Sequence, residues 1–200
     1  MIVKPTQPPD AELANSRTIL LDGLWGNPSR LSVMKRRLEA GGLRSVETFA
    51  YDSSGFACLE AEGRRLARFL RTSENPVNLV GYSMGGLLIR SAIREGDGLP
   101  VNKVAFLNTP HGGSKLARFL PGVGISQMRP GCEFLQRIDA EPWPYETLAV
   151  WTPGDLMVLP SRSACWSRAK KTSVCRVPAH VWPLISSGLH RELAEFLLSK

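Results

Sequence analysis

Short apolar runs alternate with helix-like segments along most of the chain. Six of these runs are rich in apolar and β-branched residues and have the length of buried strands. They cover residues 18–22, 45–50, 76–81, 103–108, 147–151 and 172–177. Because helical periodicity separates the runs, the strands are expected to run parallel, with helices crossing over the sheet. The pattern predicts an α/β fold, with a roughly six-stranded, mostly parallel sheet and helices on both faces.

Three segments place apolar residues on one helical face, and each predicts a helix that packs on the sheet. The three sets are Leu31, Met34 and Leu38; Leu59, Gly63, Leu66 and Leu70; and Ile185, Leu189, Leu193 and Phe196. Residues 109–144 depart from this rhythm, because they combine several Gly and Pro residues with only short apolar runs. We expect this segment to lie across the functional site, and it is too short for a large lid.

The chain of 200 residues has the length of one domain and shows no internal repeat. Residues 1–16 are largely polar and contain several prolines, so we expect a flexible N-terminal lead followed by a single domain over residues 17–200. The lead lacks the apolar core of a secretory signal, and no stretch is long and apolar enough to span a bilayer. The sequence therefore predicts a cytoplasmic protein.

The 25 basic and 18 acidic residues leave a formal net charge of +7. Because no basic region is interleaved with stacking aromatic residues, nucleic acid is not expected as a partner. The charge leaves open a weak contact with an anionic membrane surface and gives no indication of oligomeric state. Cys58, Cys132, Cys165 and Cys175 lack the pair spacing of a metal site and are expected to be reduced thiols.

One pentapeptide carries the main chemical signal of the chain. Gly81-Tyr82-Ser83-Met84-Gly85 places a serine between two glycines, directly after the apolar run of residues 77–80. This arrangement is typical of a nucleophile elbow, in which a sharp strand-to-helix turn lifts the serine Oγ clear of the backbone. The alternative is a Gly-rich turn with a capping serine, so the interpretation depends on partners elsewhere in the chain.

A serine nucleophile needs a base that takes its proton and a carboxylate that orients the base. In hydrolases built around this elbow, the order along the chain is serine, acid, histidine. Asp155 follows the run that ends at Trp151, and His180 follows the last predicted strand. His111 comes too early in the chain to be the base. The sequence therefore predicts Ser83, Asp155 and His180 as the catalytic residues.

Other residues of the same types stay open as alternatives. Asp139 and Glu141 are further candidates for the acid, although neither follows a convincing strand. His190 is the other candidate base, but it falls inside the predicted terminal helix, where a surface or partly buried side chain is expected. Trp25 and His111 are candidates for contacting substrate, and His111 is also a candidate for holding a loop.

Backbone N–H groups beside such an elbow commonly stabilise the oxyanion that forms during acyl transfer. We expect Met84 to supply one of these groups. The other is expected from the loop over residues 21–28, with Leu24 as the preferred donor and Trp25 as the alternative. Asp22-Gly23 in this loop is also compatible with an ordinary turn.

Several motifs in this order resemble the small bacterial serine lipases and esterases of the α/β-hydrolase superfamily. The resemblance extends from residue 18 to the C-terminus. It is carried by Asp22-Gly23, Gly81-Tyr82-Ser83-Met84-Gly85-Gly86, Asn108-Thr109-Pro110-His111-Gly112-Gly113-Ser114, Met128-Arg129-Pro130-Gly131-Cys132-Glu133-Phe134-Leu135, Gly154-Asp155-Leu156-Met157-Val158 and the segment around His180. Many relatives have His-Gly where this chain has Asp22-Gly23. An oxyanion hole made of backbone N–H groups is compatible with this change, while an extra carboxylate nearby can disfavour a developing anion.

The resemblance implies a minimal α/β-hydrolase fold and a serine hydrolase that cleaves carboxylic esters. Ser83 would attack the ester carbonyl, His180 would transfer the proton, and water would hydrolyse the resulting acyl-enzyme. The implied substrate is a small-molecule or lipid-like acyl ester, and neither a metal nor an organic cofactor is required. An acyl thioesterase or acyltransferase of the same fold, and a noncatalytic hydrolase-fold binding protein, remain alternatives.

Overall fold

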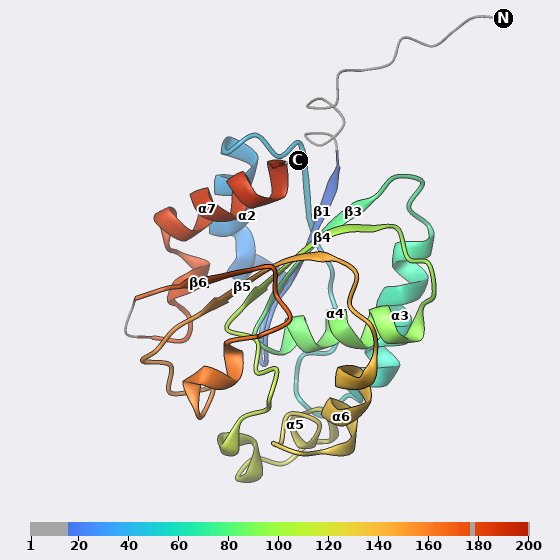
Figure 1. Ribbon diagram of the computed structural model, residues 1–200, viewed down its shortest axis with the longest axis vertical. Coiled ribbons are helices and arrows are strands. Elements are labelled where there is room, and N and C mark those ends of the chain that lie inside the picture. The colour runs from blue at the N-terminus through green and yellow to red at the C-terminus, as the bar shows by residue number, and fades with distance from the viewer. Residues whose placement is uncertain (1–15, 177–178, 200) are drawn as a thin grey trace, which may run out of the picture.

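The computed structural model describes residues 16–176 and 179–199, and it has a parallel sheet between two layers of helices (Figure 1). The sheet contains six strands in the order β2-β1-β3-β4-β5-β6, and every neighbouring pair is parallel. The strands are β1 (Arg17–Leu21), β2 (Ser45–Thr48), β3 (Val77–Tyr82), β4 (Val101–Leu107), β5 (Glu146–Trp151) and β6 (Lys171–Val174). The predicted α/β fold is confirmed, although strand ends shift by a few residues and the predicted end of the last strand, residue 177, lies outside the described residues.

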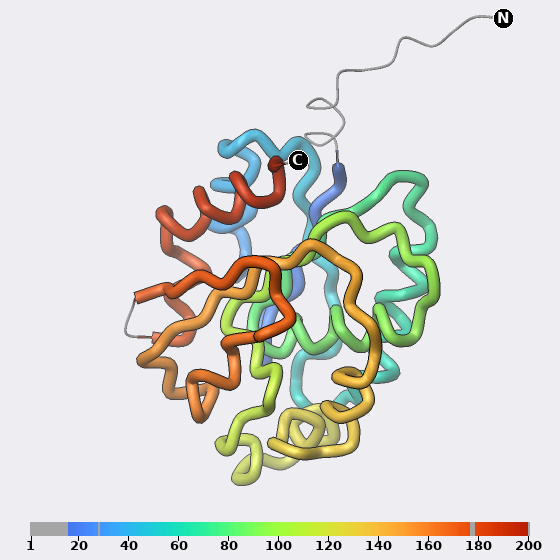
Figure 2. Tube along the Cα trace, viewed as in Figure 1, coloured from blue at the N-terminus to red at the C-terminus, as the bar shows by residue number. Residues whose placement is uncertain are grey.

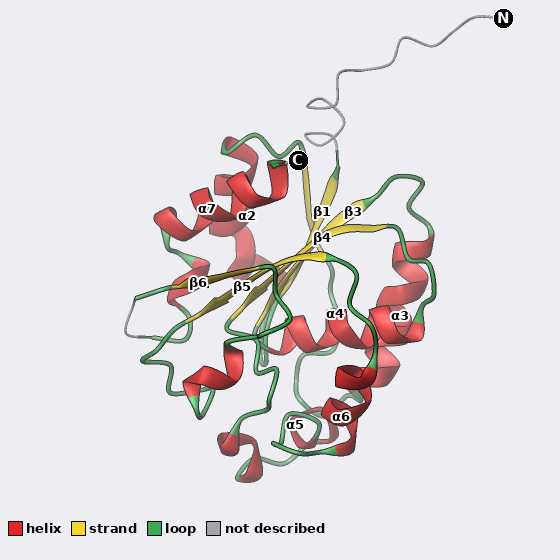
Figure 3. Ribbon diagram, in the orientation of Figure 1, coloured by secondary structure: helices red, strands yellow, loops and turns green. Residues whose placement is uncertain are grey.

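Helices cover both faces of the sheet, as the pattern predicts (Figure 3). The α-helices are α2 (Ser32–Ala40), α3 (Leu59–Arg71), α4 (Met84–Glu95), α5 (Val123–Ser126), α6 (Glu133–Ala140) and α7 (Ser187–Leu198). Short 3₁₀ helices span Pro28–Leu31, Lys115–Arg118, Ser161–Ala164 and Trp182–Leu184. Helices α2 and α7 pack on one face, and α3 and α4 pack on the other.

Two hydrophobic cores lie on the two sides of the sheet. Leu79 and Val80 are neighbours on β3, but they belong to different cores because successive side chains of a strand point to opposite faces. Leu79 packs in the core that contains Leu66 of α3, and Val80 packs in the core that contains Leu193 of α7. A strand buried on both sides has no polar face, which explains its continuous apolar run in the sequence.

The terminal helix differs from the prediction at two residues. Ser186 is its N-cap, because the Ser186 Oγ accepts a hydrogen bond from the Leu189 N–H. Ile185 therefore precedes the helix and is 47% exposed, so its assignment to the buried helical face was wrong. His190 was expected at the surface or partly buried, but it is 1% exposed and its Nε2 lies 2.9 Å from the Pro183 carbonyl oxygen.

The connections place the functional site at the carboxyl ends of the central strands. The chain moves outward from β1 to β2 in one direction and from β3 to β4 in the other, and a crevice forms outside such a reversal point. Residues 109–144 gather at this end of the molecule, where they include α5 and α6 (Figure 2). The segment that departs from the strand–helix rhythm thus covers the strand ends from which Ser83 and Asp155 emerge.

Of the predicted lead over residues 1–16, only Ser16 is among the described residues. None of the helices in the described part of the chain is long and apolar enough to cross a membrane. The four cysteines, Cys58, Cys132, Cys165 and Cys175, are all free thiols.

Candidate active site

Ser83 occupies a sharp turn between β3 and α4. Its backbone has φ 52° and ψ −122°, a conformation that non-glycine residues seldom adopt. The turn depends on glycines because the backbone packs closely around it. A Cβ atom on Gly81 would lie 2.5 Å from the Cα of Gly86, and one on Gly85 would lie 2.5 Å from the Asp22 carbonyl oxygen. These close approaches explain why glycines flank the serine in the sequence.

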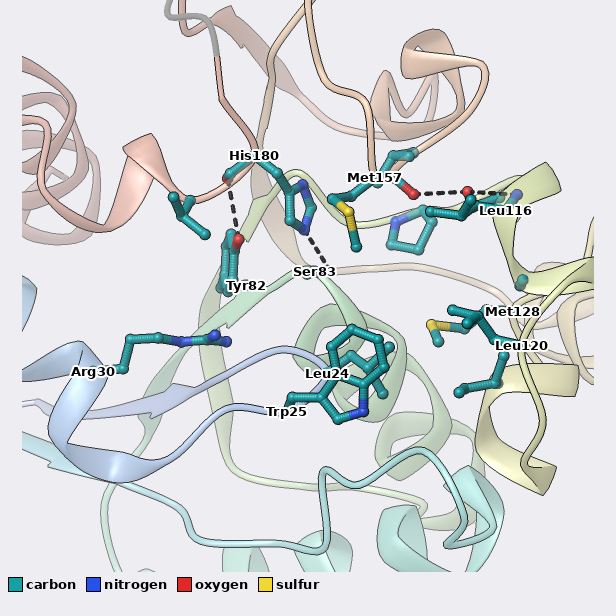
Figure 4. Close-up of a pocket in the computed structure, with 16 residues that line it drawn as sticks. Leu24, Trp25, Arg30, Tyr82, Ser83, Leu116, Leu120, Met128, Met157 and His180 are labelled. Atoms are coloured by element: carbon teal, nitrogen blue, oxygen red, sulfur yellow. Dashed lines mark hydrogen bonds between the residues drawn. The ribbon is translucent and has the colours of Figure 1, made fainter.

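Ser83, His180 and Asp155 form one hydrogen-bonded chain. The Ser83 Oγ lies 3.0 Å from the His180 Nε2, as Figure 4 shows. The His180 Nδ1 lies 2.5 Å from the Asp155 Oδ2. The three side chains follow β3, β5 and β6, so the parallel sheet brings together residues that are far apart in the sequence. This arrangement can move a proton from the serine hydroxyl to an oriented imidazole.

Asp155 uses its two carboxylate oxygens for different contacts. While Oδ2 faces His180, Oδ1 accepts hydrogen bonds from the N–H groups of Met157 at 2.8 Å and Val158 at 3.0 Å. Asp155 is 2% exposed, and these two N–H groups of its own turn fix the orientation of its carboxylate. A carboxylate held in this way fixes the position of the imidazole that it contacts.

Two residues that the sequence analysis did not single out hold the backbone of His180. The His180 carbonyl oxygen accepts hydrogen bonds from the Tyr82 hydroxyl and from the Asn108 Nδ2, each at 3.1 Å. Burial raises the pKa of Tyr82, so its hydroxyl keeps the proton that it donates. Both residues lie inside motifs noted in the sequence, but nothing in the motifs says which group they contact.

The two residues predicted to stabilise an oxyanion with their N–H groups are Leu24 and Met84. Met84 is the first residue of α4, where an N–H group has no partner within the helix. Leu24 lines the cavity beside Ser83. Among the described residues, neither the Leu24 N–H nor the Met84 N–H donates to another group. The alternative donor, the Trp25 N–H, is occupied because it donates to the Ser53 carbonyl at 2.8 Å.

No protein-family model matches the sequence, and no curated protein matches it. Solved structures are similar in fold. The mature lipase BlEst2 of Bacillus licheniformis has 21% identity, with a TM-score of 0.74 over 98% of this chain and 96% of that chain. Lipase B of Aspergillus fumigatus has 16% identity, with a TM-score of 0.76 over 95% of this chain and 54% of that chain. The ydeN gene product of B. subtilis has 14% identity, with a TM-score of 0.66 over 93% of this chain and 100% of that chain.

The chain has the α/β-hydrolase fold. The expectation drawn from the sequence motifs is thereby confirmed at the level of fold. The chain spans about half the length of the Aspergillus lipase and nearly the full length of the mature Bacillus lipase.

A cavity of about 200 Å³ opens beside the Ser83 side chain (Figure 4). Most of its lining is apolar. The apolar lining residues are Leu24, Trp25, Pro110, Leu116, Ala117, Leu120, Ile125, Met128, Met157, Val158 and Val181. Leu120 and Met128 lie on one side of Ser83, and Arg30 and Tyr82 lie on the other (Figure 4). The predicted contact residue Trp25 is thus part of the lining, and the segment after β4 supplies much of one wall.

The Asp22 carboxylate, whose effect on the site the sequence left open, is paired with Arg30. The Arg30 Nη2 donates to the Asp22 Oδ1 at 2.6 Å, and the Arg30 Nε donates to the Asp22 Oδ2 at 2.9 Å. The carboxylate is 4% exposed and also accepts hydrogen bonds from the Gly23 and Asn27 N–H groups. Sequence analysis missed Arg30, because no motif connects it with Asp22.

His111 lies in an aromatic cluster and is not among the residues that line the Ser83 cavity. Its ring stacks on Trp166 with centroids 4.7 Å apart, and it meets the edge of Phe106 at 4.8 Å. Burial, together with the nearby Arg90 charge, holds the His111 pKa well below its usual range. Of the two roles considered for His111, this placement favours holding a loop.

The two alternative acids form ion pairs away from Ser83 and His180. Asp139 forms an ion pair with the buried Arg90, and the Glu141 Oε1 lies 3.5 Å from the Arg94 Nε. Within the part of the chain that the structure describes, no group of three or more His, Cys, Asp or Glu side chains is arranged to hold a metal ion.

Proposed function

We propose that the protein is a serine hydrolase that cleaves carboxylic esters. The observation that carries this proposal is the hydrogen-bonded chain from Ser83 through His180 to Asp155, with distances of 3.0 Å and 2.5 Å. Lipases from B. licheniformis and A. fumigatus have the same fold, which supports the reaction class. A neutral imidazole that is hydrogen-bonded to both groups can act as base and then as acid without rearrangement.

In the first half of the proposed reaction, the Ser83 Oγ attacks the ester carbonyl carbon while the His180 Nε2 takes the hydroxyl proton. The carbonyl oxygen becomes an oxyanion, which the N–H groups of Leu24 and Met84 stabilise by hydrogen bonds. The tetrahedral intermediate then collapses. The bond to the alcohol oxygen breaks, His180 gives its proton to that oxygen, and an acyl group remains on Ser83.

Water completes the cycle. His180 removes a proton from the water, whose oxygen attacks the acyl carbon through a second tetrahedral intermediate. The acid leaves when the bond to the Ser83 Oγ breaks, and His180 returns the proton to the serine. The proposed steps require neither a metal nor an organic cofactor, because the imidazole carries every proton and the serine carries the acyl group.

The cavity supports acyl esters with an apolar acyl group as the substrate class. Its wall beside Ser83 is formed by Leu116, Leu120, Ile125 and Met128, which offer no charged group to the substrate. Burying an acyl chain against such a wall removes apolar surface from water and so favours binding. We therefore propose a small-molecule or lipid-like acyl ester.

A fluorophosphonate probe and a short-chain p-nitrophenyl ester test this proposal. Wild-type protein should form a covalent adduct at Ser83 and hydrolyse the ester, and Ser83→Ala should lose both properties without loss of fold. Asp155→Asn should lower kcat by about 10³- to 10⁴-fold, because the oriented tautomer of His180 is lost.

Asp139→Asn is the matched control for Asp155→Asn. It removes an acidic group that the sequence left open as the acid, and it breaks the ion pair with Arg90, so it should lower thermal stability while kcat stays near the wild-type value. Ester turnover by Ser83→Ala at the wild-type rate would rule out the mechanism. Preference for acyl thioesters in the same assay would instead assign the thioesterase alternative.

A further inference from the structure

The pair formed by Asp22 and Arg30 lies beside the site, and the mechanism above does not use it. We propose that this ion pair is a positioning device for the oxyanion loop, residues 22–27, and that Arg30 neutralises a carboxylate that would otherwise oppose the oxyanion. This inference rests on the proposed function, because it concerns the rate of the same ester hydrolysis.

The Asp22 carboxylate organises the loop through several hydrogen bonds. Its Oδ1 accepts from the Gly23 N–H at 2.7 Å, and its Oδ2 accepts from the Asn27 N–H at 3.1 Å. The contacts therefore join the first and last parts of the loop to one side chain. A Cβ atom on Gly26 would overlap the carboxylate, so the loop backbone lies directly against it. A displaced carboxylate would move the backbone on both sides of Leu24.

The backbone of the loop is in close contact with the serine turn. A Cβ atom on Gly23 would lie 2.8 Å from the Ser83 Cβ, and the Asp22 carbonyl oxygen closely approaches Gly85. The Tyr51 hydroxyl donates to the same Asp22 carbonyl at 2.6 Å. The position of the Leu24 N–H relative to Ser83 thus follows from the position of Asp22. A displacement of about 1 Å at such a group is enough to change a rate by about 10²-fold.

The charge of Asp22 needs compensation because it is buried next to a site where negative charge develops. Arg30 supplies it through Nε and Nη2, which both contact the carboxylate. Asp22 and Arg30 face each other with side-chain exposures of 6% and 31%, so the contact is poorly screened by solvent. Without Arg30, the carboxylate would oppose the oxyanion in the transition state more than it affects binding of a neutral ester.

Four proteins test the pair: wild type, Arg30→Gln, Arg30→Lys and the double variant Asp22→Asn/Arg30→Gln. Turnover of a neutral p-nitrophenyl ester separates kcat from KM. Arg30→Gln should lower kcat on the order of tenfold with little change in KM, because the lost interaction acts on the transition state. The kcat of the double variant should be at least about threefold higher than that of Arg30→Gln, since the double variant removes the uncompensated charge. Arg30→Lys, which keeps the charge, should retain more kcat than Arg30→Gln.

Arg17→Gln is the matched control. Like Arg30, Arg17 forms a two-pronged ion pair with a carboxylate, that of Glu47, but Arg17 is the first residue of β1 and this pair lies away from the carboxyl end of the strand, where Ser83 lies. Its loss should leave kcat unchanged. Circular dichroism melts establish that each variant is folded, and if Arg30→Gln does not fold, the comparison of Arg30→Lys and the double variant with wild type carries the test.

The outcomes distinguish this inference from the proposed function. Unchanged kcat in Arg30→Gln, or a double variant that is no faster than Arg30→Gln, would overturn the role of the pair while Ser83 labelling still supports ester hydrolysis. Wild-type protein that neither reacts with the fluorophosphonate nor hydrolyses the ester would overturn both.

Discussion

Arg30 and Asp155 show how single side chains contribute to the site through their hydrogen bonds. One carboxylate oxygen of Asp155 accepts hydrogen bonds from two backbone N–H groups, and the other contacts His180. Arg30 neutralises Asp22 beside the loop that carries Leu24. In both places a buried carboxylate has a full set of hydrogen-bond donors, which is the condition under which a buried charge is tolerated.

His111 predicts a pH dependence of stability. Burial, and then the Arg90 charge, lower its pKa well below its usual range in the folded protein. In the unfolded chain a histidine pKa is about 6.5, so below that pH only the unfolded state takes up the proton. The free energy of unfolding should therefore fall as the pH decreases below about 6.5, by about 1.4 kcal/mol per pH unit from this residue, until the folded pKa is reached.

Urea unfolding at pH 7.5 and pH 5.5 measures this effect. His111→Asn should lose less stability between the two pH values than wild type. Trp166→Phe is the control, because it changes the ring that stacks on His111 without removing a titrating group. An equal loss in wild type and His111→Asn would contradict the assignment.

At the scale of elements, the site depends on close packing between helices and strands. Helix α4 begins at the serine turn and packs against α3, where Gly63 faces Ser91. A Cβ atom on Gly63 would lie 2.8 Å from the Ser91 Cβ and even closer to the Ser91 Oγ. The glycine in the middle of α3 is thus explained by the approach of α4.

Two Gly→Ala substitutions in helices should have opposite effects. Alanine favours a helix over glycine by about 1 kcal/mol, whereas forcing an extra group into a packed contact costs about 1–3 kcal/mol. Gly63→Ala should therefore lower the free energy of unfolding, by about 1 kcal/mol. Gly188→Ala in α7 should raise the free energy of unfolding, because a Cβ built there has no heavy atom within 4 Å apart from its chain neighbours and the backbone of its own helix.

Chemical denaturation of the two variants measures this difference in free energy of unfolding. A gain in stability for Gly63→Ala would show that α3 and α4 separate easily to accept the methyl group. Such a result would contradict the close packing of α4, and with it the rigid placement of the serine turn.

At the scale of the whole molecule, two exposed apolar side chains directly precede cavity-lining residues in the sequence. Phe119 is 81% exposed and precedes the lining residue Leu120, while Leu156 is 74% exposed and precedes the lining residue Met157. Exposed apolar groups beside a binding cavity are typical of an interaction surface. We call Phe119 and Leu156 the apolar rim. Under the proposed function, the apolar rim would contact the surface of an aggregated lipid-like ester.

Phe119→Ser/Leu156→Ser should therefore lower the rate on an emulsified long-chain ester and leave the rate on a water-soluble short-chain ester near wild type. The apolar rim contacts the aggregate and not the reacting atoms, so only the first rate depends on it. Val174→Ser, which removes an exposed apolar residue on β6, is the control and should change neither rate. A parallel loss on both esters would show that the two residues act within the cavity instead.

Much of the fold could be predicted from the sequence because its signals are local. Runs such as residues 77–80 are apolar throughout, and a parallel strand buried on both faces requires such a run. Ile185 was misassigned because the N-cap contact of Ser186, not apolar spacing, fixes where the terminal helix begins. The order of Ser83, Asp155 and His180 along the chain was also visible, since each follows a strand.

The strand–helix alternation, the serine turn and the order of Ser83, Asp155 and His180 are visible in the amino-acid sequence. Other features arise only when the chain folds: the pair of Arg30 with Asp22, the contacts of Tyr82 and Asn108 with the His180 carbonyl, and the place of His111 in an aromatic cluster. Periodicity and turn residues act over a few positions, so the chain displays them directly. Contacts between side chains depend on distances in space, which exist only after the sheet has aligned segments from distant parts of the chain.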